Sequence, residues 1–220
     1  RGAYHALKDM NMWDVLGRFL PAFRPIVGQM QHDLYHIFTV DQHTLRCVRN
    51  IRRFARSEFA HEYPRCSHLM SGFSKPWRIV IAGLFHDIGK GQGGHHELIG
   101  ARKMAEFGET FGFDQDDIDF MVFLVRNHLL MSQVAQRQDI SDPTVVRRFA
   151  DTVGTKERLD ALYLLTVADI RATSPKVWTP WKGQLLERLY LSAADMLSGS
   201  ASSDKAMEMR LEEARSTLLK

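Results

Sequence analysis

The sequence has few cysteines and almost no excess of charge, and both shortages narrow what the protein can be. Cys47 and Cys66 are the only cysteines among 220 residues. Their spacing fits neither a disulfide framework nor a zinc site of the CxxC type. Free thiols in a reducing cytoplasm are the simple interpretation, so we expect a cytoplasmic protein. The formal net charge of +3 at pH 7 is too small to predict a nucleic-acid partner.

The sequence also lacks a long apolar run. No segment approaches the roughly 20 apolar residues that a membrane-spanning helix needs, so we expect no membrane partner. The first residues, from Arg1 to His5, contain neither a methionine nor the apolar centre of a signal peptide. We therefore expect the chain to be a section of a longer protein.

Positive charge gathers in one place only. Five arginines recur every three or four positions along a predicted helix, a spacing that is typical of a solvated helix face. They are Arg46, Arg49, Arg52, Arg53 and Arg56.

Apolar residues recur at helical spacing along the whole chain, while two-residue alternation is scarce. This pattern predicts an all-α fold. Thr39 and Gln42 match a capping box, which predicts that a long helix begins at this point. A loop is expected over residues 63–76, where prolines and a glycine occur, and a linker over residues 198–203. The other predicted helices cover residues 77–88, 96–107, 114–131, 143–153, 156–173, 181–197 and 203–219.

The predicted helix over residues 77–88 is apolar on nearly every side, which is typical of a central, buried helix. It ends in His86 and Asp87, just before a glycine-rich stretch. Adjacent side chains within a helix point about 100° apart, but at a helix end the backbone turns away and both can face one cavity. A buried aspartate beside a buried histidine is costly unless a cation compensates the charge. The pair therefore predicts a metal site.

Two further residues extend this predicted ligand set. His43 lies at the border of the apolar stripe of its helix, and Asp169 interrupts the apolar run over residues 164–170. Two imidazoles and two carboxylates suit divalent manganese, iron or zinc. Taken singly, His43 fits a packed histidine and Asp169 fits a capping or salt-bridged carboxylate. The four residues together favour the metal site.

The order His43, His86-Asp87, Asp169 resembles that of the HD superfamily of metal-dependent phosphohydrolases. More narrowly, the chain resembles the central HD domain of the bacterial bifunctional uridylyltransferase/uridylyl-removing enzymes, which modify the nitrogen regulatory protein PII. Where that family has Asp-His after two glycines, this chain has His95-His96, so His96 takes the position of the family histidine. The resemblance extends from about residue 21 to residue 198. Its matching stretches are residues 27–31, 35–44, 84–94, 126–131, 139–143, 165–170 and 178–182.

The resemblance implies a helical bundle with a metal site between its helices. It implies a helical segment over residues 1–26 that continues a preceding region, and the phosphohydrolase domain over residues 27–200. Residues 201–220 would form a helix leading to a regulatory region outside this chain, where glutamine would be sensed. The implied activity is hydrolysis of the phosphodiester that joins UMP to a tyrosine of uridylylated PII.

The resemblance also assigns roles to residues. His43, His86, Asp87 and Asp169 would hold a divalent metal, manganese or magnesium in the first place and iron or zinc as alternatives. His96 and His128 could hold a second ion that Asp87 bridges, or could bind the phosphate or protonate the leaving oxygen. Asp87, Lys90 and His128 are the predicted catalytic residues, with Lys90 contacting the phosphate.

Simpler interpretations remain for several of these residues. His96 could be a surface histidine, His128 a core histidine, and Lys90 a solvated lysine at a helix C-terminus. Trp178 and Trp181 could stack on uracil, or they could pack against the last helices. For the whole chain, the alternatives are hydrolysis of a free nucleotide such as guanosine tetraphosphate and a non-catalytic module that relays a signal or docks PII.

Overall fold

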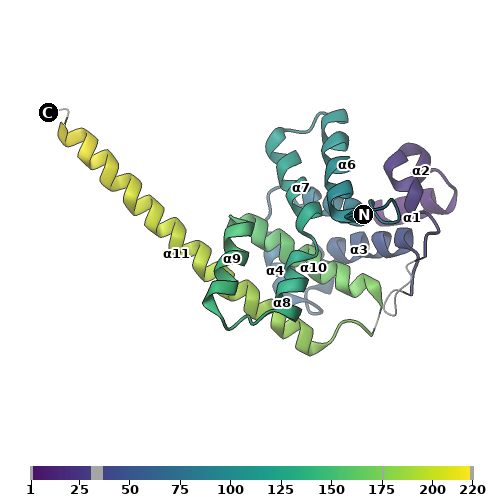
Figure 1. Cartoon of the computed structure of the whole chain (residues 1–220). Coiled ribbons are helices and arrows are strands. Elements are labelled where there is room, and N and C mark those ends of the chain that lie inside the picture. The colour runs from purple at the N-terminus through teal and green to yellow at the C-terminus, as the bar shows by residue number, and fades with distance from the viewer. Residues whose placement is uncertain (1, 31–36, 175, 219–220) are drawn as a thin grey trace.

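The computed structural model describes residues 2–30, 37–174 and 176–218, and every regular element in this part of the chain is helical. The all-α prediction is therefore confirmed for the described residues. Gln31, Tyr35 and His36 of the matching stretches, and residue 219 of the last predicted helix, lie outside them. The elements, drawn in Figure 1, are α1 (Ala3–Met12), α2 (Leu16–Phe19), η1 (Pro21–Ile26), α3 (Val40–Phe54), η2 (Ser57–Phe59), α4 (Pro64–Ser71), α5 (Trp77–Phe85), α6 (His96–Thr110), α7 (Gln115–Asn127), α8 (Leu130–Arg137), α9 (Pro143–Val153), α10 (Lys156–Thr173) and α11 (Pro180–Leu218).

Three predicted elements differ from the structure. The loop predicted over residues 63–76 contains helix α4, because Pro64 stands in its first turn, where a missing N–H costs nothing. The helix predicted over residues 114–131 is two helices, α7 and α8, separated at His128 and Leu129. The linker predicted over residues 198–203 is helical and lies inside α11. Serine and glycine cost at most about 1 kcal/mol each in a helix, which helical neighbours on both sides outweigh.

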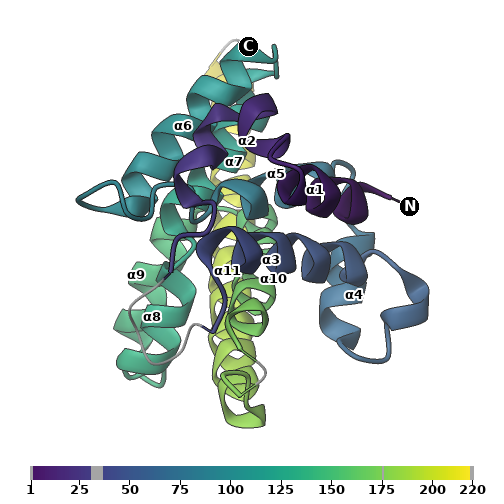
Figure 2. The ribbon, with the colours of Figure 1, turned by 90° about the vertical axis from the view of Figure 1, so that its right-hand side faces the viewer.

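The capping box predicted at the start of α3 is only half right. Thr39 is the N-cap residue, as predicted, but its side chain makes no capping hydrogen bond. The neighbouring Asp41 is buried instead and accepts hydrogen bonds from the backbone N–H of Gly28, at 3.1 Å, and from Asn11 Nδ2, at 2.8 Å. These bonds tie α3 to the N-terminal helices, which lie on the side of the molecule that faces the viewer in Figure 2.

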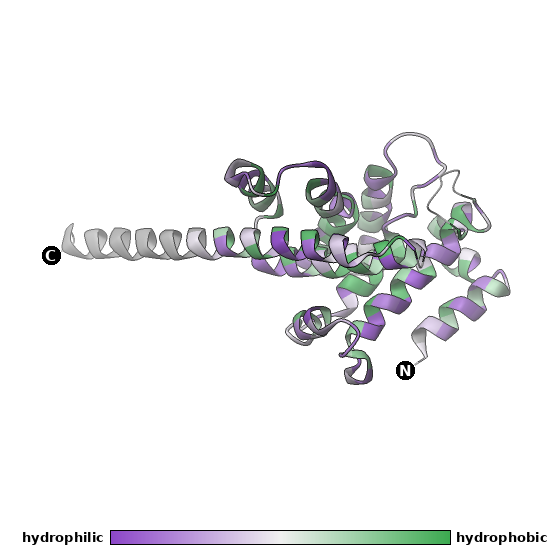
Figure 3. Cartoon of the chain, turned by 90° about the horizontal axis from the view of Figure 1, so that it is seen from below, coloured by the Kyte–Doolittle hydropathy of each residue, from purple (hydrophilic) through white to green (hydrophobic). Residues whose placement is uncertain are grey.

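Helix α10 forms the centre of the bundle. It is buried on nearly every face, from Leu159 to Thr173, and it contacts α3, α5, α7 and α11. Its neighbour α3 is strongly amphipathic, and hydrophobic and hydrophilic bands alternate along the helices in Figure 3. Leu16, Phe23 and Ile26 of the N-terminal segment are buried in the same core. A polar side chain on α10 is therefore held in a closely packed environment, and Asp169 is only partly exposed.

The N-terminal part of α11 packs against α8, α9 and α10, and the helix then extends away from the bundle (Figure 1). Among the described residues, no helix combines the length and the apolarity that crossing a membrane requires.

Candidate metal centre

Five segments bring polar side chains to one buried point. His43 comes from the first turn of α3, His86 and Asp87 from the end of α5, and Asp169 from the C-terminal part of α10. His96 is the first residue of α6, and His128 is the C-cap residue of α7. All six residues that the sequence predicts as metal ligands therefore lie together. They divide into two groups of three whose ligand atoms lie within 4.8 Å of one another: His43, His86 and Asp169, and Asp87, His96 and His128.

His86 and His128 are each oriented by a hydrogen bond to a backbone carbonyl three residues earlier. Each stands directly after a helix, where backbone carbonyls lack a partner inside the helix. His86 Nδ1 lies 2.8 Å from the carbonyl oxygen of Gly83, and His128 Nδ1 lies 2.7 Å from that of Val125. A carbonyl oxygen only accepts, so in both residues Nδ1 donates and the neutral ring presents its Nε2 lone pair to the cavity. This is the tautomer that a metal ligand requires.

The first group is closely spaced. His43 Nε2 lies 2.9 Å from Asp169 Oδ1 and 3.2 Å from His86 Nε2. Ligands about 2.1 Å from an ion and at right angles to one another lie about 3.0 Å apart. The third separation, from His86 Nε2 to Asp169 Oδ1, is 3.6 Å, so the three atoms are spaced as adjacent ligands of one cation could be.

In the second group the ligand atoms are slightly farther apart, but they are again imidazole nitrogens and a carboxylate oxygen. His96 Nε2 and His128 Nε2 are 3.3 Å apart, and they lie 3.5 and 3.7 Å from Asp87 Oδ1. The side chain of His96 is partly exposed, whereas His128 and Asp87 are buried. In the first group Asp169 is likewise partly exposed, so each group has two buried members and one that reaches solvent.

Asp87 belongs to both groups. Its Oδ1 faces His96 and His128, while its Oδ2 lies 3.4 Å from both His43 Nε2 and His86 Nε2. This is the arrangement of a carboxylate that can bridge two cations. Lys90 Nζ lies 2.8 Å from the same Oδ2, so the lysine is directed at the centre rather than into solvent.

The protonation states show how strongly the two carboxylates act on the site. Burial lowers the pKa of His86, but the charges of Asp87 and Asp169 outweigh it and raise that pKa to about 10. Burial raises the pKa of Asp87 and of Asp169, yet the neighbouring imidazoles, together with Lys90 for Asp87, bring both pKa values well below the usual range. His128 differs, because burial and the charge of His86 lower its pKa to about 4. A divalent cation can replace the proton held between the carboxylates, so this donor set fits a metal.

Three residues that the sequence analysis did not single out support the centre. Asn50 lies seven residues after His43 on the same face of α3, and its buried Nδ2 donates to the carbonyl of Ala168 at 3.0 Å. That bond fixes α10 beside Asp169. Gly89 has no room for a side chain, since a Cβ there would lie 2.3 Å from the carbonyl oxygen of His96, and Gly100 is tightly packed, since its Cβ would lie 3.0 Å from Val125 Cγ1. The glycines let α6 approach the end of α5.

Other residues that the sequence analysis discussed lie outside the two groups. His95 is largely exposed, and its Nδ1 lies 3.0 Å from Glu97 Oε1. Trp178 packs on the ring of Tyr63 and against Gly183, as its simpler interpretation predicts. Trp181 is 61% exposed.

The centre lies inside the part of the chain that matches a known family. The model of the HD domain family matches residues 40–173, which include every residue of the two groups. The chain is 56% identical, over 98% of its length, to the bifunctional uridylyltransferase/uridylyl-removing enzyme of Ralstonia nicotianae. It is 55% identical, over 99% of its length, to the enzymes of the same name from Burkholderia mallei and Burkholderia pseudomallei.

The chain spans about a quarter of the length of these curated relatives, 25% of each. The family match covers more than half of the chain, and the ligand order that suggested the family is the one that converges in space. Membership of this family implies a divalent metal. The chain belongs to the HD domain family.

Proposed function

We propose that this chain hydrolyses the phosphodiester between UMP and a tyrosine of the nitrogen regulatory protein PII. The relatives' name includes a uridylyl-removing activity, and the chain is similar to them over nearly its whole length. The observation that carries the proposal is the convergence of four histidines and two aspartates, from five segments, on one buried point. A cluster of this kind serves hydrolysis of a phosphoester better than transfer of a nucleotide to a new acceptor, because it can activate water.

The ligands in this proposal are His43, His86, Asp87 and Asp169 for one cation, with His96, His128 and Asp87 for a second. A bound divalent cation neutralises the charge of the phosphodiester and lowers the pKa of water. Imidazole-rich donor sets suit first-row transition ions better than magnesium, so we propose manganese, with iron and zinc as alternatives.

Lys90 and His128 then have different tasks. Lys90 is held next to Asp87 and bears a positive charge, so we assign it to a non-bridging oxygen of the phosphate, where negative charge develops. His128 is neutral at pH 7, because burial lowers its pKa, and its Nε2 is an acceptor. We therefore assign it to metal binding rather than to protonation of the leaving group. A tyrosine with a reference pKa of about 10 leaves without strong acid catalysis.

The test is release of UMP from uridylylated PII by the purified chain in manganese. We expect release that a chelator abolishes and that Asp87→Ala abolishes as well. Asp116→Ala is the matched control, since Asp116 is an exposed acidic residue on α7, and it should leave release unchanged.

Two outcomes would contradict the proposal. Hydrolysis of guanosine tetraphosphate without release of UMP from PII would assign the chain to the free-nucleotide hydrolases. Binding of uridylylated PII without any hydrolysis would make the chain a docking module.

A further inference from the structure

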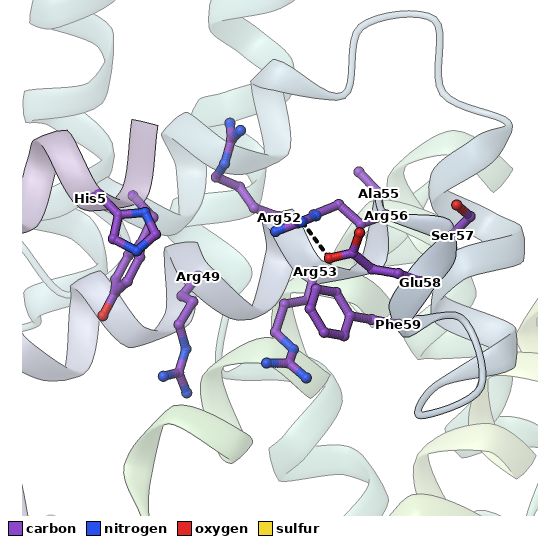
Figure 4. Close-up of a pocket in the computed structure, with 10 residues that line it drawn as sticks. His5, Arg49, Arg52, Arg53, Ala55, Arg56, Ser57, Glu58 and Phe59 are labelled. Atoms are coloured by element: carbon purple, nitrogen blue, oxygen red, sulfur yellow. Dashed lines mark ion pairs between the residues drawn. The ribbon is translucent and has the colours of Figure 1, made fainter. Parts of the chain in front are cut away.

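We propose that the arginine pocket between α1 and the end of α3 binds a ligand with several adjacent phosphate groups, such as a nucleoside triphosphate or a chain of inorganic phosphate. The pocket has a volume of about 550 Å³, within the range of small-molecule sites. None of its lining residues belongs to the metal centre. Four arginines, Arg49, Arg52, Arg53 and Arg56, line it together with His5 and Phe59, as Figure 4 shows.

The pocket contains more positive charge than its own carboxylates neutralise. Arg53 pairs with Glu62, and Arg56 pairs with Glu58, the contact drawn as a dashed line in Figure 4. Arg49 and Arg52 form no ion pair with any described residue. Two uncompensated guanidinium groups therefore line one cavity, and such a site favours an anionic ligand.

The environment of Arg49 shows that this pocket is not an ordinary solvated helix face. Its Nε atom is buried and has no hydrogen-bond partner among the described residues. A buried donor on a charged group is costly when it has no acceptor, and such groups usually have one. Solvation satisfies an exposed arginine but does not reach this atom. A ligand in the pocket meets the outer part of the Arg49 side chain, and a small rotation of that side chain would bring Nε to an acceptor as well.

The shape of the pocket favours an extended anion over a compact one. Figure 4 shows the side chains of Arg49 and Arg52 extending in different directions from α3, with His5 on one side and Phe59 on the other. A single phosphate could meet only one of the two guanidinium groups. A chain of phosphates can meet both, and the planar guanidinium binds phosphate oxygens with two parallel hydrogen bonds.

The test is calorimetric titration of the whole chain with ATP, tripolyphosphate and adenosine, in buffer without divalent cations, so that the metal centre does not contribute. We expect ATP and tripolyphosphate to bind and adenosine not to bind. Equal affinities for the first two would assign recognition to the phosphates, and tighter binding of ATP would add a nucleoside contact.

Substitutions of the two arginines test whether the phosphate compounds bind in this pocket. Arg49→Gln and Arg52→Gln should each weaken binding about tenfold or more, because each removes a charge-assisted contact. Arg102→Gln is the control, since Arg102 is an exposed arginine on α6, and it should bind as the unaltered chain does. Thermal melting of each variant checks the fold. The proposal is overturned if neither phosphate compound binds at millimolar concentration, or if correctly folded Arg49→Gln and Arg52→Gln variants bind as tightly as the control.

Discussion

Replacing Gly89 by alanine should damage the metal centre without altering any of its ligands. The new Cβ would lie 2.3 Å from the carbonyl oxygen of His96 and 2.9 Å from Ile99 Cβ. Ordinary contacts are about 3.4 Å or longer, so the start of α6 must move by about 1 Å. His96 moves with it, away from Asp87 and His128, while the groups on α3 and α10 stay in place.

The size of the effect follows from this displacement. A misplacement of about 1 Å in a catalytic constellation can cost about 100-fold in rate. Added volume at a closely packed position also destabilises a protein by about 1–3 kcal/mol. We therefore expect Gly89→Ala to release UMP about 100-fold more slowly, and to lose the cation of the second group while keeping that of the first.

Rates are measured by following release of UMP from uridylylated PII, and cations are counted by elemental analysis after dialysis. Gly72→Ala is the matched control, because a Cβ at Gly72 makes only an ordinary contact, 3.5 Å from the carbonyl oxygen of Leu69. A folded Gly89→Ala variant with unchanged rate and cation content would refute the reasoning, since α6 would then be free to adjust without consequence for His96.

Three further predictions concern the separability of the two cation sites, a buried arginine and the effect of manganese on stability. Asp169→Asn and His128→Gln should each lower the cation content by about one ion, because each lies in a different group; loss of both ions in either variant would contradict two separable sites. Arg78→Ala should destabilise the protein by about 1–3 kcal/mol in urea unfolding, because buried Arg78 packs over Phe120 and pairs with Asp117, which keeps Lys75 as a partner; an unchanged unfolding free energy would contradict this. Manganese at 100 times its dissociation constant should raise the unfolding free energy by about 2.7 kcal/mol, and an absent shift would mean that it does not bind the folded state.

Helices α9 and α10 were predicted with the correct bounds because residues next to their ends cap or terminate them. Asp142 accepts a hydrogen bond from the backbone N–H of Thr144 at the start of α9, and Thr155 accepts one from that of Arg158 at the start of α10. Gly154 ends α9 with a φ of 78°. These interactions involve residues close in sequence, so the sequence alone contains them.

The break between α7 and α8 has no such signal. The apolar pattern continues through His128, and nothing nearby in sequence ends the helix. His128 turns out of the helix where it meets His96 and Asp87, which are 32 and 41 positions away along the chain. The continuity of α11 was missed because serine and glycine there suggest a linker, although their cost in a helix is small.

His86, Asp87 and Asp169 could be predicted as ligands because each interrupts an apolar pattern and buried charge requires a partner, and His43, at the border of its stripe, completed the set. The second group could be predicted only through the resemblance, since His96 and His128 are compatible with surface and core positions. The arginine pocket could not be predicted. Arginines at spacings of three and four look the same whether water or another helix faces them, and only the packing of α1 distinguishes the two cases.

Helix α3 carries a metal ligand near its start and the arginine pocket near its end. His43 and Arg52 are nine residues apart on one helix, which is about 14 Å. Thermodynamic linkage therefore makes any coupling between the two sites reciprocal. If a phosphate ligand in the pocket tightened cation binding by some factor, the cation would tighten binding of that ligand by the same factor. Titrating the ligand once with manganese and once without it would measure that factor, which applies equally to the affinity for the ligand and the affinity for the cation.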